Sequence, residues 1–234
     1  MFFSRLLAVG FLLATIPLLA DETAATRPAK EALAVFNDLI GSWRGTATPA
    51  GSREDAQKGF WIEKLTWEWQ FKGKDAWLKV AFEKSKNFTG GELRYVPEQD
   101  AFALTLRTPA KEAITFTGPF KNKVLTLERQ NKEETQRLVF TLLHANRFLY
   151  RYEVRPAGKT LFAKQYGVGV TKEGEAFASG DGKPECIVSG GLGTTPVVYG
   201  GKTYYVCCSG CRDEFREHPE KYIKEYEAKK KAKK

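Results

Sequence analysis

Short segments in which polar and apolar residues alternate make up most of the chain between positions 43 and 170. A period of two is typical of half-buried β-strands. We expect ten strands, near residues 43–48, 60–71, 76–83, 91–96, 101–107, 113–117, 123–128, 136–142, 147–154 and 161–170. Turn-forming residues fill the connections, which are too short for the crossovers that parallel strands need. The sequence therefore predicts a mainly β fold built on an antiparallel meander.

A meander of this length has two edges, and closing the sheet into an up-and-down barrel removes both. The inward side chains would then either fill the barrel or enclose one small apolar ligand, and the sequence leaves these two states open. Before the first strand, residues 30–40 have the apolar spacing of an amphipathic helix, which Gly41 would end.

All five tryptophans lie between positions 43 and 77. Packing in the barrel core is one explanation. The alternative is an aromatic pocket with one fixed carboxylate, because Glu63 has the same strand phase as Trp67 and Trp69. The candidate ligand-pocket residues are Trp43, Glu63, Trp67 and Trp69.

Gly41-Ser42-Trp43 is a Gly-x-Trp motif that follows a short helix and enters the first strand. Together with the ten-strand meander, it resembles the lipocalin-like calycin barrels over roughly residues 31–175. The resemblance implies binding of a small hydrophobic molecule. It also implies that a basic side chain from a late strand lies across the tryptophan, with Arg151, Arg155 and Lys164 as candidates.

The four cysteines are confined to a short C-terminal module: Cys186, Cys207, Cys208 and Cys211. Gly-Gly at 200–201 between two alternating segments predicts a tight hairpin, and a helical pattern begins at residue 212 and breaks before Pro219. One thiolate from a knuckle, one from a hairpin end and one from a first helical turn would meet at a point, as in small metal sites. A module of about 50 residues buries little core, and a metal ion would supply the missing folding free energy.

Cys186, twenty residues, Cys207, three residues and Cys211 form the C-x(19–22)-C-x3-C pattern of the TRASH and YHS metal-binding domains. The sequence is similar to YHS domains over nearly all of residues 183–226. This resemblance implies a small α+β, treble-clef-like fold that binds a transition metal. Cys208 is an additional thiol and a candidate fourth ligand. Four thiolates would suit Zn(II), and two or three would suit Cu(I).

Two other chemistries remain open for the cysteines. In an oxidising compartment they could pair as two disulfides. Cys208-Ser209-Gly210-Cys211 at a helix start also has the spacing of a redox Cys-x-x-Cys motif. However, only 23 residues follow Cys211, and they lack the strands that a thioredoxin-like fold places after its motif.

Residues 1–20 have the order of a secretory signal peptide, with a lone Arg5, an apolar run and then an acidic pair. An uncleaved anchor is the alternative. We therefore expect an exported protein, periplasmic or extracellular, with no integral membrane segment after cleavage. The expected organisation is signal peptide 1–20, linker 21–30, β-barrel 31–178, metal-binding module 183–227 and basic tail 228–234.

The net charge of +9 comes from 37 basic and 28 acidic residues. The lysine-rich tail could contact anionic surfaces, whereas no motif supports nucleic-acid binding. The two histidines, His144 and His218, leave no Ser-His-Asp or Cys-His-Asn set, so the sequence favours a non-enzymatic protein.

Two functions follow from these observations. The first is an exported transition-metal-binding protein that sequesters or delivers its ion through the cysteine cluster. The alternative is a carrier of a small hydrophobic ligand in the barrel, with the cysteine module purely structural through zinc or disulfides.

Overall fold

The computed structural model of the protein describes residues 27–173 and 184–232. The expected signal peptide, most of the expected linker, the expected boundary between barrel and module, and the last two residues of the basic tail lie outside the described residues.

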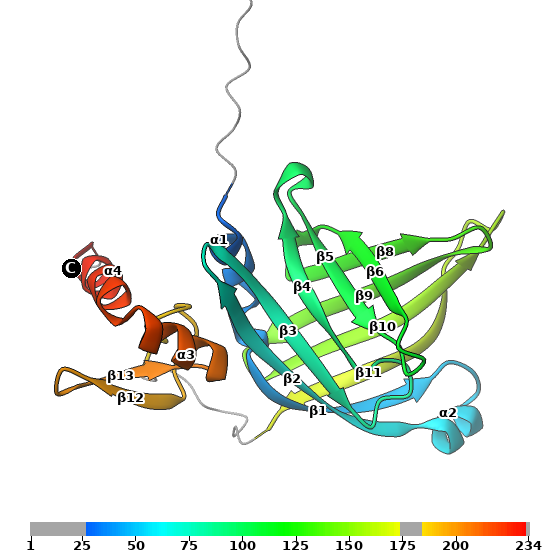
Figure 1. Ribbon diagram of the computed structural model, residues 1–234. Coiled ribbons are helices and arrows are strands. Elements are labelled where there is room, and N and C mark those ends of the chain that lie inside the picture. The colour runs from blue at the N-terminus through cyan, green and yellow to red at the C-terminus, as the bar shows by residue number, and fades with distance from the viewer. Residues whose placement is uncertain (1–26, 174–183, 233–234) are drawn as a thin grey trace, which may run out of the picture.

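Ten antiparallel strands form a closed barrel (Figure 1), in which each strand pairs with its neighbours along the chain and β1 pairs with the last strand. The strands are β1 (Gly41–Pro49), β2 (Trp61–Lys72), β3 (Asp75–Glu83), β4 (Gly90–Val96), β5 (Ala101–Arg107), β6 (Ala113–Gly118), β8 (Val124–Gln130), β9 (Glu134–His144), β10 (Arg147–Pro156) and β11 (Ala163–Lys172). The two-residue strand β7 (Phe120–Lys121) pairs with β8 only. The predicted ten-strand meander and its closure are confirmed.

One helix of the barrel domain was not predicted from the sequence. Helix α2 (Arg53–Gly59) connects β1 and β2 and begins with a capping box, in which the Ser52 hydroxyl accepts a bond from the Asp55 amide and the Asp55 carboxylate accepts one from the Ser52 amide. No residue of α2 is buried. The sequence of α2 therefore has no apolar periodicity from which a helix could be predicted.

The segment before the barrel differs from the predicted single α-helix. It begins as α1 (Ala29–Leu33) and continues as the 3-10 helix η1 (Ala34–Leu39). Side chains three residues apart eclipse one another in a 3-10 helix. This places Leu33, Phe36 and Leu39 on one buried face, and the Phe36 ring lies 4.9 Å from that of Phe102 and 4.8 Å from that of Phe120. The segment therefore packs across one end of the barrel.

Trp43 anchors this end segment to the barrel. Its indole Nε1 donates a 2.6 Å hydrogen bond to the Leu39 carbonyl, and its ring packs edge-on against Phe148 at 4.8 Å. The cation across this tryptophan is Lys172 of β11, with Nζ 5.2 Å from the ring centroid.

The three cations expected at that position were wrong. Arg151 instead bonds Glu153, Arg155 lies over the Phe162 ring, and the Lys164 side chain lies beside Gly167. The lysine that fills the role comes at the very end of the last strand, where β11 pairs with Trp43 itself.

The C-terminal module contains β12 (Thr195–Tyr199), β13 (Lys202–Val206), α3 (Ser209–Glu217) and α4 (Pro219–Ala232). Gly200 and Gly201 turn the hairpin with φ of 57° and 73°, as the Gly-Gly pair predicts. Helix α3 starts three residues before the expected position, and α4 begins at Pro219 and extends into the lysine-rich tail. Among the described residues no helix combines the length and apolarity that crossing a membrane requires.

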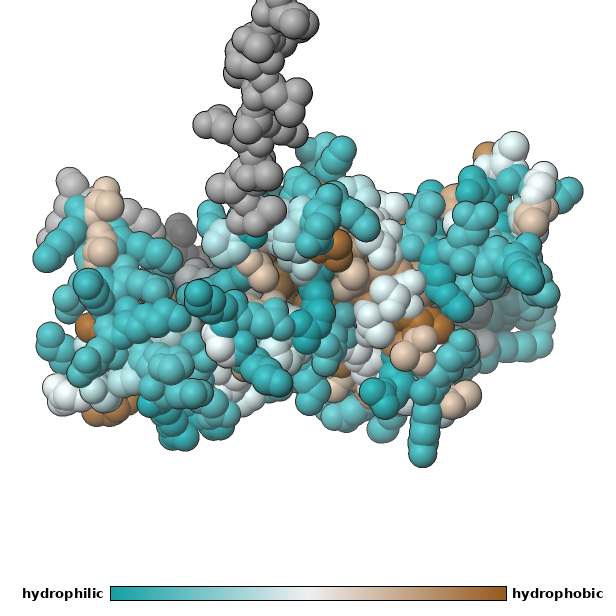
Figure 2. Space-filling model, turned by 45° about the horizontal axis from the view of Figure 1, so that its top comes forward, coloured by the Kyte–Doolittle hydropathy of each residue, from teal (hydrophilic) through white to brown (hydrophobic). Residues whose placement is uncertain are grey.

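The module lies beside the barrel at the end covered by α1, with α3 next to β2 (Figure 1). On the face shown in Figure 2, most of the surface is hydrophilic over both the barrel and the module.

Candidate metal centre

Three of the four cysteine sulfurs form a compact group although they come from separate backbone segments, and the fourth, Cys208, lies next to it. Cys186 lies in a turn, Cys207 directly follows β13, Cys208 precedes α3 and Cys211 lies in the first turn of α3. The sulfurs of Cys186, Cys207 and Cys211 all lie within 4.8 Å of one another. The Cys207 sulfur is 3.5 Å from that of Cys211 and 3.9 Å from that of Cys208.

Backbone hydrogen bonds hold the turn that carries Cys186. The Cys186 amide donates to the Gly191 carbonyl at 2.6 Å, and the Gly190 amide donates back to the Cys186 carbonyl at 2.9 Å. The next residue, Ile187, donates its amide to the Tyr205 carbonyl of β13 at 2.9 Å. Gly190 has a φ of 75°, which suits a residue without a side chain. The knuckle is thus closed on itself and attached to the hairpin that ends at Cys207.

The cluster is largely enclosed. Cys186 and Cys211 are 1% and 0% exposed, whereas Cys207 and Cys208 are half-buried. All four are free cysteines in this structure, and the sulfur separations of 3.5 and 3.9 Å far exceed a disulfide bond of about 2.05 Å.

The four thiols divide into two that ionise readily and two that do not. Hydrogen bonds from the Cys207 thiol, and next from Cys211, lower the pKa of Cys186 to about 2 and that of Cys208 to about 3. Donating those bonds raises the pKa of Cys207, and burial is the main cause of the raised pKa of Cys211. The close packing of the sulfurs thus favours the ionised form at Cys186 and Cys208, and binding a metal ion through any thiol that is still protonated releases its proton.

The donor set fits a soft or borderline transition-metal ion. An ion bound tetrahedrally through bonds of about 2.3 Å places its sulfurs about 3.8 Å apart. The sulfur separations of 3.5 and 3.9 Å around Cys207 lie near this value. Sulfur-only ligation suits Zn(II) or Cu(I), not the oxygen-preferring Mg²⁺ or Ca²⁺.

A second group of possible ligands lies at the end of α3, where Glu214, Glu217 and His218 approach one another within 4.8 Å. The Glu214 carboxylate already accepts a 2.7 Å bond from the Tyr222 hydroxyl. Glu217 and His218 are exposed, and His218 ends the helix. The contacts of this group are those of an ordinary helix C-terminus.

The four residues of the expected ligand pocket are all buried, and Glu63 lies well apart from Trp69 along β2. Glu63 and Trp69 point to the same face of β2, six residues apart, which is about 20 Å along a strand. The buried Glu63 carboxylate accepts a 2.9 Å bond from the Trp61 indole and another from the Tyr150 hydroxyl. Burial, and then the negative Glu63, raises the pKa of Tyr150 well above its usual value.

The aromatic members of this set are packed into the core. Trp43, Trp67 and Trp69 are almost fully buried among the barrel side chains. The sequence showed the alternation of these tryptophans with polar residues, but not the contacts that they make. The partners of Glu63 come from the far strand β10 and from the position two residues before Glu63, which no motif marks.

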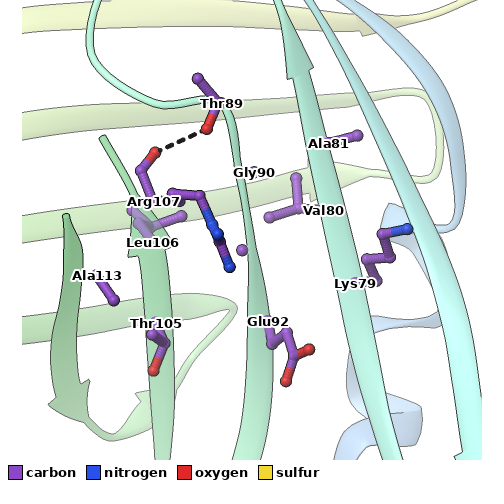
Figure 3. A pocket seen from close by; sticks show the side chains of 11 residues that line it. Lys79, Val80, Ala81, Thr89, Gly90, Glu92, Thr105, Leu106, Arg107 and Ala113 are labelled. Carbon is purple, nitrogen blue, oxygen red and sulfur yellow. Dashed lines mark hydrogen bonds between the residues drawn. The ribbon is translucent and has the colours of Figure 1, made fainter. Parts of the chain in front are cut away.

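A hollow of about 490 Å³ lies on the outer wall of the barrel, over β3, β4 and β5 (Figure 3). Its floor lacks side chains at Gly90 and Gly91, and a Cβ at Gly91 would lie 2.4 Å from the Thr105 carbonyl oxygen. These glycines thus permit close approach of the neighbouring strands. The rim has the opposite charges of Lys79, Glu92 and Arg107, and none of the cysteines lies there.

Comparison with known proteins identifies one part of the chain. Residues 195–226 match the family model of the YHS domain, which spans the hairpin, α3 and the first half of α4. The match includes Cys207, Cys208 and Cys211, and Cys186 lies before it. No curated protein matches the chain. The closed ten-strand barrel is consistent with a calycin-like architecture, and the C-terminal module is similar to the YHS domain over residues 195–226.

Proposed function

We propose that this protein is an exported, non-enzymatic transition-metal-binding protein whose ion is held by Cys186, Cys207 and Cys211, with Cys208 as the fourth ligand for Zn(II). One observation carries the proposal: the free sulfurs of Cys186, Cys207 and Cys211 converge within 4.8 Å of one another, and the Cys208 sulfur lies 3.9 Å from that of Cys207. The YHS match over residues 195–226 supports the same chemistry.

The burial of the sulfurs favours sequestration or delivery of the ion. Cys186 and Cys211 are enclosed and would hold it away from solvent. Cys207 and Cys208 are half-buried, so a thiol or imidazole of an acceptor can approach the ion from their side. The periplasmic or extracellular location rests on the signal-peptide pattern of residues 1–20.

The barrel interior gives no specific support for the hydrophobic-carrier function. Its pocket residues are packed against other core side chains, and the carboxylate of Glu63 already accepts two internal hydrogen bonds. Neither feature favours a bound ligand over a filled barrel.

The test is elemental analysis of the mature protein, purified from an exported preparation without chelator. We expect one Zn or Cu per chain, and loss of that ion in Cys186→Ser and in Cys211→Ser. Ser85→Ala, on the barrel, is the control that should keep the wild-type metal content. A metal-free wild type whose cysteines are paired as two disulfides would contradict the proposal.

A further inference from the structure

The end of strand β2 that faces the module has an open backbone edge. Pairing of β2 with β1 stops at Trp67, opposite Gly41, whereas β2 itself continues to Lys72. Backbone groups beyond this point need other partners. The Trp69 amide, directed away from β3, donates a 3.3 Å hydrogen bond to the Cys208 sulfur. The Cys208 sulfur of the cysteine cluster thus accepts the hydrogen bond that a neighbouring strand would otherwise accept.

The residues that follow Cys208 fit the same edge closely. A Cβ on Gly210 would lie 1.6 Å from the Trp69 carbonyl oxygen, and its three nearest atoms all belong to β2. The Cα–H of Gly210 therefore points at that carbonyl. The Ser209 hydroxyl donates a 2.8 Å bond to the Glu68 carboxylate. The start of α3 is shaped to this strand edge, and only glycine fits at position 210.

A second path joins the same tryptophan to the other side of the cluster. The Trp69 indole donates a 3.1 Å bond to the Asn37 side-chain oxygen, and the Asn37 amide group donates a 3.0 Å bond to the Ser189 carbonyl. The Ser189 amide lies 3.5 Å from the Cys186 sulfur, and its hydroxyl lies 3.4 Å from the Cys207 sulfur. The barrel therefore supports the cluster through both Cys208 and the knuckle.

We propose that the barrel is part of the metal centre: docking of β2 and η1 onto the module fixes Cys208 and the knuckle, and thereby sets how tightly the ion is held. This inference rests on the proposed metal-binding function. An N–H donor directed at a thiolate stabilises its charge, and outer partners of this kind typically change metal affinity 10–100-fold. Release of the docked barrel would weaken the site without removing a ligand, so this interface is where ion delivery can be controlled.

The first test uses Gly210→Ala in the full chain, because the three atoms nearest to the added methyl group all belong to β2 of the barrel. Gly169→Ala is the matched control, since its Cβ would meet only Leu149 at an ordinary 3.9 Å. Chelator competition with Zn(II), and separately with Cu(I), measures the affinity. We expect about tenfold or greater weakening in Gly210→Ala, faster hydrogen exchange at the Trp69 amide, and wild-type behaviour in the control.

A second variant keeps the proposal falsifiable if Gly210→Ala fails to fold. Asn37→Ala combined with Glu68→Ala removes barrel contacts and leaves the module sequence unchanged. Glu83→Ala combined with Asn87→Ala is its control, at the opposite end of the β2–β3 pair. We expect the first pair to weaken metal binding and the control pair to leave it unchanged.

The outcomes separate the two proposals. A wild-type protein without one bound ion contradicts the metal-binding function itself. A wild-type protein with one ion, and with unchanged affinity in the Asn37/Glu68 variant, overturns the role of the barrel and leaves the metal-binding function standing.

Discussion

At the scale of single residues, Cys208 has a position different from those of the other three cysteines. Its sulfur contacts Cys207 at 3.9 Å but also accepts the Trp69 amide of the barrel. The backbone at Cys208 is extended, with φ of −159°, so neighbouring side chains leave it in different directions. Cys186, Cys207 and Cys211 form a compact three-sulfur site, and Cys208 lies beside it, next to Cys207.

We predict that Cys208→Ser separates the two candidate ions. Zn(II), which prefers four ligands, should bind more weakly, whereas Cu(I) should still bind through three thiolates. Competition titrations with each ion measure this difference, with Cys211→Ser as the variant that loses both. Equal loss of both ions in Cys208→Ser would contradict the assignment of the three-sulfur set.

The buried Glu63 inside the barrel also leads to a prediction. Tyr150→Phe removes one of its two donors and should lower the free energy of unfolding by about 1–3 kcal/mol, because a buried polar group loses a partner. Chemical denaturation followed by tryptophan fluorescence measures the change. Tyr95→Phe, at an exposed hydroxyl bonded to Asp100, is the control and should change stability much less. Equal effects of the two substitutions would argue against the importance of the buried carboxylate.

At the scale of elements, β9 and β10 are joined by charge as well as by their backbone. The Glu153 carboxylate accepts a 2.7 Å bond from the Arg137 Nε and a 2.6 Å bond from the Arg151 Nε. Burial alone would raise the pKa of Glu153, but the bonds from Arg151 and Arg137 outweigh it and lower the pKa.

The sign of the resulting pH dependence follows from that lowered pKa. The folded state holds the Glu153 proton less tightly than the unfolded state, so its stabilising contribution is fully present above the ordinary value of 4.5. The contribution is lost as the pH falls through the lower pKa of the folded state. We predict that Glu153→Gln flattens the loss of stability in acid, measured by denaturation at a series of pH values. Glu98→Gln, in the exposed 3-10 helix Pro97–Gln99, should retain the wild-type slope. An unchanged slope in Glu153→Gln would contradict the prediction.

The elements that could be predicted from the sequence are those in which buried apolar residues recur at a regular spacing. Alternation along β2 predicted that Glu63, Trp67 and Trp69 share one face of the strand, and all three are buried. Helix α2 was not predicted because none of its residues is buried. The 3-10 helix from Ala34 was predicted as α-helix because its buried residues recur every three positions, a spacing that one face of an α-helix also shows.

Only the ligands of the candidate site could be predicted. The spacing of the four cysteines predicted that their thiols meet. The barrel contacts were not accessible, because they use the backbone of Trp69 and the missing side chain of Gly210, which no sequence pattern marks.

At the scale of the whole molecule, the barrel and the YHS-containing module act as one support for the cysteine cluster. The module by itself has a short hairpin and two helices, and its core continues into that of the barrel. Lys30 of α1 extends the contact, with its Nζ 4.5 Å above the Tyr222 ring of α4. An ion bound to the cluster stabilises the folded state of this combined structure in proportion to its affinity.

The central claim is that the four-cysteine cluster holds a transition-metal ion through sulfur. X-ray absorption at the metal edge of the full-length mature protein tests it most directly, because the spectrum reports the ligand atoms and their distances. We predict sulfur ligands only, three for Cu(I) or four for Zn(II), at about 2.3 Å from a zinc ion and somewhat closer to copper. A first coordination sphere of nitrogen and oxygen atoms would contradict the account.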